Sequence, residues 1–142
     1  MKYPQTTANE LSENIKSIAK YGCLAMCYIY CAGIDEDNEI EYLRIVNNGI
    51  REGTLDKDCT VKDAEKFLFG ITGRKVTVTK SNVQNISEIK NPAPVRFVAE
   101  GYGGHWVVVQ NGKIVFNPLA NSVNVNKGKP VETRTIKWGI EK

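Results

Sequence analysis

The stretch that decides the fold is residues 21–30, which read YGCLAMCYIY. A glycine leads into an apolar run that opens with Cys23. The run is too short to cross a bilayer, which needs about 20 apolar residues, so it predicts a buried helix over residues 23–31 that ends at Gly33. At the start of that helix, the Cys23 sulfur would lie beside unpaired backbone N–H groups and the positive end of the helix dipole. Both features favour the thiolate, the reactive form of cysteine.

Length and charge limit the classes of protein to which the chain can belong. A chain of 142 residues predicts a single domain with a core of its own. The net charge of +3 is small and the lysines are scattered, so a nucleic-acid partner is not expected. The sequence has no export signal and no segment that could span a bilayer, which predicts a cytoplasmic protein without a membrane partner. The oligomeric state stays open.

The cysteines predict neither a disulfide framework nor a metal site. Cys23, Cys27 and Cys31 recur every fourth residue and therefore share one helix face. A zinc site would need a C-x-x-C pair or more histidines, and the acidic run at residues 35–38 lacks the glycine and glutamate of a calcium loop. We therefore interpret Cys27 and Cys31 as small core residues and expect no metal and no cofactor.

The order of the elements predicts an α+β domain. Amphipathic patterns and caps predict helices over residues 7–20, 23–31 and 39–50, and a fourth helix that begins after the cap at residues 60–63 and ends near Gly73. Alternating, β-branched segments predict strands over residues 75–79, 95–99, 106–109, 113–116 and about 133–138, with a helical turn at 87–89. Helices followed by strands favour an antiparallel sheet, against which the cysteine helix packs.

Three residues are candidates for nucleophilic catalysis. The only histidine, His105, enters a strand from a glycine-rich loop, and it is the candidate base for Cys23. A hairpin turn at Asn111-Gly112 places Asn117 opposite His105 or one pair off, where its side-chain carbonyl would accept a hydrogen bond from the imidazole. The set is Cys23, His105 and Asn117. Two of the three also have a plain structural reading, His105 as a structural residue after the glycines and Asn117 as a turn former before Pro118.

Together these residues resemble the papain-like cysteine hydrolases. Cys23, the strand His-Trp-Val-Val-Val from His105 and the pair Asn117-Pro118 are similar to bacteriocin-leader peptidases, which have Asp-Pro at the last position. The cysteine helix ending at Gly33-Ile34 and the hairpin after His105 resemble NlpC-type cell-wall hydrolases. The whole chain is similar to small papain-like proteins of phages and spirochaetes. The resemblance implies a papain-like fold and cleavage of an amide in a peptide, a protein or a cell-wall fragment.

Two departures keep other functions open. Ser17 stands where the leader peptidases have a glutamine that donates to the oxyanion, and loss of one such donor costs about 100- to 1000-fold in rate. Gly22-Cys23-Leu24-Ala25 also lacks the aspartate and serine of the NlpC-type motif. A catalytically silent papain-like module that binds a host or phage protein is the alternative from another class. A transglutaminase-like transferase would use the same three residues.

Overall fold

The computed structural model describes residues 22–57, 59–101, 103–118 and 128–139. Within these ranges the chain is α+β, and the expected antiparallel sheet is confirmed. The helix expected over residues 7–20 and the position of Ser17 lie outside the described residues. The described elements are helices α3 (Cys23–Cys31), α4 (Glu39–Glu52) and α5 (Ala64–Thr72), the 3-10 turn η1 (Ile86–Glu88), and strands β1 (Val76–Asn82), β2 (Ala93–Ala99), β3 (Gly103–Gln110), β4 (Lys113–Phe116) and β5 (Lys129–Trp138).

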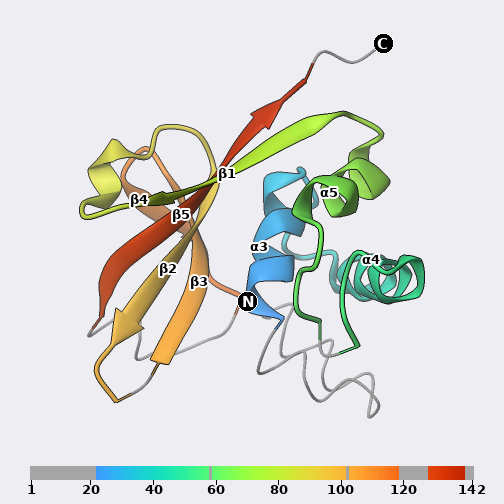
Figure 1. Cartoon of the computed structure of the whole chain (residues 1–142), viewed down its shortest axis with the longest axis horizontal. Helices are drawn as coiled ribbons and strands as arrows, with labels where there is room; N and C mark the ends of the chain where they lie inside the picture. The colour runs from blue at the N-terminus through green and yellow to red at the C-terminus, as the bar shows by residue number, and fades with distance from the viewer. Residues whose placement is uncertain (1–21, 58, 102, 119–127, 140–142) are drawn as a thin grey trace.

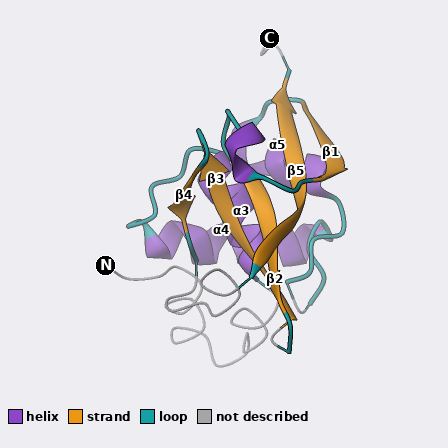
Figure 2. Cartoon of the chain, turned by 90° about the vertical axis from the view of Figure 1, so that its left-hand side faces the viewer, coloured by secondary structure: helices purple, strands orange, loops and turns teal. Residues whose placement is uncertain are grey.

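The sheet has the strand order β1-β5-β2-β3-β4, and each neighbouring pair is antiparallel. Figure 1 shows the three helices on one side of this sheet, with α3 between the sheet and α4. Figure 2 shows the opposite side, where the strands lie in front of the helices. The chain therefore builds a helical layer from its first half and a sheet from its second half, with α3 at the boundary between them.

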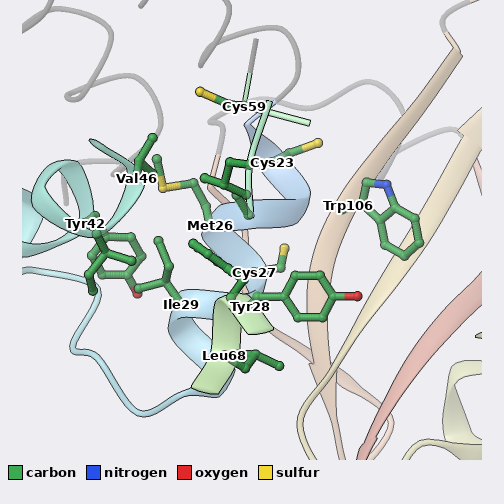
Figure 3. Close-up of a cluster of buried hydrophobic side chains, with 14 of the residues drawn as sticks. Cys23, Met26, Cys27, Tyr28, Ile29, Tyr42, Val46, Cys59, Leu68 and Trp106 are labelled. Atoms are coloured by element: carbon green, nitrogen blue, oxygen red, sulfur yellow. The ribbon is translucent and has the colours of Figure 1, made fainter. Parts of the chain in front are cut away.

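Helix α3 is the centre of the main core. It begins at Cys23 after Gly22, whose carbonyl accepts the first helical hydrogen bond from Met26 N–H at 2.9 Å. It ends before Gly33, which adopts φ +96° and stops the helix in the left-handed region as the sequence predicts. Its side chains are buried around most of the helix, and they pack on α4, on α5 and on the facing side of β3 (Figure 3).

A second, smaller core covers the other face of the sheet. Strand alternation sends Trp106 and Val108 toward α3, and it sends Val107 and Val109 to the opposite face. There they pack with Val83, Val95 and Phe97 under the connection that contains η1. Both faces of the central strands are consequently buried, which is why β3 reads as a continuous apolar run.

Several predicted boundaries are too short. Helix α4 continues to Glu52, where Gly53 at φ +83° ends it, whereas α5 begins at Ala64 with Asp63 as its N-cap, as predicted. Strand β3 begins at Gly103, inside the stretch that the sequence predicts as a loop, because Gly103 and Gly104 pair with β2. Strand β5 begins at Lys129 for the same reason, since its first residues pair with Val98 and Phe97. No helix in the described part of the chain is long and apolar enough to span a membrane.

Candidate active site

Cys23 lies at the start of α3 with its side chain on the side of the helix that faces β3 (Figure 3). Its sulfur meets three backbone N–H groups, those of Trp106, Leu24 and Cys23 itself, which all favour the thiolate. The groups of Cys23 and Leu24 belong to the first turn of α3, where N–H groups have no helical acceptor. The sequence anticipates these two, whereas the N–H of Trp106 comes from the sheet.

Burial of the thiol has the opposite effect on its pKa from these N–H donors. Only 8% of Cys23 is exposed, and desolvation of the charged form raises the pKa of its thiol more than the three N–H groups and the charge of Arg96 lower it. The resting side chain is therefore a neutral thiol. Ionisation requires a base that removes the proton or a substrate that changes the surroundings of the sulfur.

The base predicted from the sequence is His105 on β3. Its Nε2 lies 2.9 Å from Oδ1 of Asn117, so the contact that the hairpin predicts is present. Because an amide oxygen only accepts, Nε2 carries the proton and Nδ1 holds the lone pair. Burial lowers the pKa of the imidazole, and the hydrogen bond to Asn117 partly opposes this change. His105 is thus a neutral ring whose basic nitrogen is Nδ1.

A β-bulge brings Asn117 to the same face as His105. Val109 pairs with Ile114, but Val108 pairs with Phe116, so Val115 is an extra residue in β4. Continuing this register by one residue places Asn117 opposite Val107, which shares a face with His105. Without the bulge, Asn117 would oppose Trp106 and point to the other face. The bulge is the feature that makes the His105–Asn117 contact possible.

The structure places the Cys23 thiol against one face of strand β3 and the imidazole of His105 on the opposite face. The thiol interacts with the N–H of Trp106, and the imidazole belongs to the residue before it. The N–H of Trp106 is open to the thiol because the pairing between β3 and β4 ends at Val108. No hydrogen bond joins Cys23 to His105, although both are described residues. His105 shares its sheet face with Phe97, its cross-strand partner, and this face is turned away from α3.

A charged cluster beside the thiol is absent from the sequence prediction. Arg96 is the cross-strand partner of Trp106, and its guanidinium lies 3.7 Å from the carboxylate of Glu132. The same carboxylate binds Arg134 at 2.9 Å, and Arg134 stacks 4.6 Å from the centre of the Trp106 ring. The signal that points to it is an arginine inside the apolar strand β2, where a charge needs a partner or a function.

A pocket adjoins this cluster. It has a volume of about 290 Å³ and lies between α3, the start of α5, and strands β1 and β5. Leu24, the residue after Cys23, lines it, and so does Arg134. The pocket therefore offers room for a ligand group beside Arg134, although Cys23 itself does not line it.

Known proteins add no further constraint on the site. Comparison of the chain with protein-family models, with curated proteins and with solved structures finds no match in any of the three. Among the residues that the structure describes, no three His, Cys, Asp or Glu side chains form a group that could hold a metal ion.

Proposed function

We propose that the protein is a papain-like cysteine hydrolase that cleaves an amide bond in a peptide, a protein or a cell-wall fragment. The observation that carries this proposal is the contact at Trp106, where the Cys23 thiol lies against β3 one residue away from His105, which is on the opposite face of the strand. The same imidazole is oriented by Asn117 at 2.9 Å. A thiol at a helix start, a neutral imidazole and an amide that holds the imidazole are the groups that acyl transfer through cysteine requires.

In the proposed reaction, His105 Nδ1 takes the proton of the Cys23 thiol, and the sulfur attacks the carbonyl carbon of the substrate. The N–H of Cys23 donates to the oxygen that becomes negative. The C–N bond then breaks, and the leaving amine takes the proton from His105. Water attacks the resulting thioester with His105 again as the base, which releases the acid and restores the thiol. Asn117 keeps Nε2 protonated throughout.

This reaction requires a rearrangement from the described state. Cys23 and His105 are 8% and 5% exposed, and they share no hydrogen bond. Because the imidazole lies on the sheet face turned away from α3, the backbone at the start of β3 must rearrange to bring Nδ1 to the sulfur when substrate enters. Catalytic contacts that tighten only in the substrate complex are common in hydrolases.

The proposal is tested by the rate of alkylation at each cysteine. We expect Cys23 to react with iodoacetamide faster at pH 7 than Cys27, Cys31 and Cys59, which serve as internal controls in the same chain. His105→Ala should remove most of this advantage, because burial alone keeps the thiol neutral. Mass spectrometry of tryptic peptides measures the four rates in parallel. A Cys23 rate that is unaffected by His105→Ala would contradict the assignment of the base.

Hydrolysis is then sought with a library of peptides and peptidoglycan fragments. Cys23→Ala and His105→Ala should each abolish any cleavage that is found. Cleavage that survives either substitution would mean that another group carries the reaction.

The second candidate is a catalytically silent module that binds a host or phage protein. The specific observation in its favour is that the thiol and the imidazole are both buried and not bonded to each other. This reading predicts a stoichiometric complex with one partner that survives Cys23→Ser, without turnover of any library member. Turnover that depends on Cys23 would exclude it.

A further inference from the structure

We propose that Arg96 is an anion-recognising residue of the candidate site, and that the substrate class is amides that carry a carboxylate beside the scissile bond. The inference rests on the proposed function, because it takes Cys23 as the reactive group. It goes beyond that function by naming a specificity residue and the charge of the substrate.

The position of Arg96 is the first support. The guanidinium lies across Gly104, the residue before His105, so closely that a Cβ built on Gly104 would stand 2.7 Å from Cζ of Arg96. Only a glycine leaves room for this arrangement in the described conformation. In the neighbouring strand β3, the residue opposite Arg96 is Trp106, whose N–H interacts with the Cys23 thiol. The positive charge therefore lies on the α3 face of β3, beside Gly104 and Trp106 and within electrostatic reach of the Cys23 thiol.

The ion pairs of the cluster leave a net positive charge. Arg96 and Arg134 share the single carboxylate of Glu132, so the three side chains together carry a charge of one. The guanidinium of Arg134 is already occupied by contacts within the protein, because it is only 12% exposed, binds Glu132 at 2.9 Å and stacks on Trp106. Arg96 is 39% exposed and lies at 3.7 Å from the same carboxylate. Its guanidinium keeps donors for an incoming anion.

The shape and charge of the guanidinium favour a carboxylate as the ligand. Its planar donors match the two oxygens of a carboxylate, and the group stays charged at any pH at which the protein is folded. Arg96 also stabilises the thiolate of Cys23 through its charge, so an anion bound there lies within electrostatic reach of the sulfur. An acidic group on the substrate would thus be held next to the carbonyl that Cys23 attacks.

Two alkylating reagents test this without a known substrate. Iodoacetate and iodoacetamide both form an S–C bond with the Cys23 thiolate as iodide leaves, but only iodoacetate carries a carboxylate. Since both report the same thiolate fraction, the ratio of their rates isolates recognition of the carboxylate. We expect Arg96→Gln to lower this ratio about threefold to tenfold, the effect of one charge at short range near a protein surface. The wild-type ratio should also fall with added salt.

Three further variants separate recognition from other effects. Arg96→Lys keeps the charge and should keep most of the ratio. Gly104→Ala changes no charge but displaces the guanidinium, so it should lower the ratio as Arg96→Gln does. Arg51→Gln removes the same charge from the exposed face of α4, on the far side of α3 from the sheet, and should leave the ratio unchanged (Figure 1). Protection of the buried Cys27 from both reagents confirms that each variant is folded.

The outcomes distinguish this inference from the proposed function. A ratio that is unchanged in both Arg96→Gln and Gly104→Ala overturns recognition by Arg96, while a His105-dependent iodoacetamide rate leaves the hydrolase proposal standing. A lowered ratio together with a His105-independent rate supports the anion site and contradicts the base. If Cys23 reacts with neither reagent, the thiol is closed to ligands and both proposals fail.

Discussion

The properties of His105 depend on which ring nitrogen Asn117 holds. With Nε2–H donated to the amide oxygen at 2.9 Å, the ring is neutral, and burial keeps the pKa of the imidazole below its ordinary value of 6.5. Replacing the amide with a carboxylate would change the balance. Asn117→Asp places a negative charge against Nε2–H, which favours the imidazolium.

We therefore expect Asn117→Asp to raise the pKa of His105 by about one to three units. The chain has only one histidine, so its Cε1–H signal in an NMR pH titration reports this pKa without assignment. Asn91→Asp adds the same charge at an exposed position outside the site and should leave the titration unchanged. A variant at residue 117 that titrates like the wild type would show that the contact is not maintained in solution.

At the residue scale, the sequence predicts the groups but not their relation. Cys23, His105 and Asn117 are recognisable because each stands at a helix start, a strand start or a hairpin end. The bulge at Val115 is not recognisable, since an extra residue in a strand depends on packing rather than on a local pattern. Arg96 is missed for a similar reason. Its partner Glu132 lies on a different strand, and only the sheet order makes them neighbours.

At the scale of elements, local signals determine the helix and turn boundaries well. Asn38 caps α4 by accepting from Glu41 N–H, Asp63 caps α5 by accepting from Lys66 N–H, and glycines end both helices. The hairpin turn is equally local. Asn111 and Gly112 adopt φ values of +53° and +73°, the two positive values of a type I′ turn. Strand ends are predicted less well because the pairing partner decides them.

The turn at Gly112 sets the register that joins β3 to β4, so we expect Gly112→Ala to destabilise the protein. A side chain in the left-handed region costs about 1–2 kcal/mol, and its Cβ would lie 3.3 Å from Ser87 Cα. Asn111→Gly is the matched control, because glycine accepts the positive φ of the adjacent position. Urea unfolding measures both free energies. Equal stability of the two variants would mean that the turn does not constrain the hairpin.

At the scale of the molecule, the α+β class is predictable and the sheet order is not. The class depends on helical patterns that precede strand patterns along the chain, and each pattern is local. The order β1-β5-β2-β3-β4 places the last strand between the first two, which requires long-range pairing that no short window contains. The contact between α3 and β3 that forms the candidate site depends on this order. Its existence is therefore a property of the whole fold.

The central position of α3 leads to a prediction about the whole molecule at high pH. Burial raises the pKa of Cys27 and Cys31 on α3 above their ordinary value of 9.0, and that of Tyr28 and Tyr42 above 10.0. The Tyr42 hydroxyl also donates to the carbonyl of Ile34 at 2.9 Å, which only the protonated form can do. These groups hold their protons when folded and lose them when unfolded, so their contribution to stability is complete below pH 9 and is lost as pH rises.

We expect the free energy of unfolding to fall above pH 9, by about 1.4 kcal/mol per pH unit for each group that stays protonated only in the folded state. Urea unfolding under reducing conditions from pH 7.5 to 10.5 measures this slope. Cys27→Ala removes one such group and should make the slope shallower by that amount. Ile29→Ala creates a cavity on the same helix and should lower stability equally at every pH, because no proton is involved. Equal slopes for Cys27→Ala and the wild type would mean that the Cys27 thiol does not stay protonated in the folded protein and that water reaches α3.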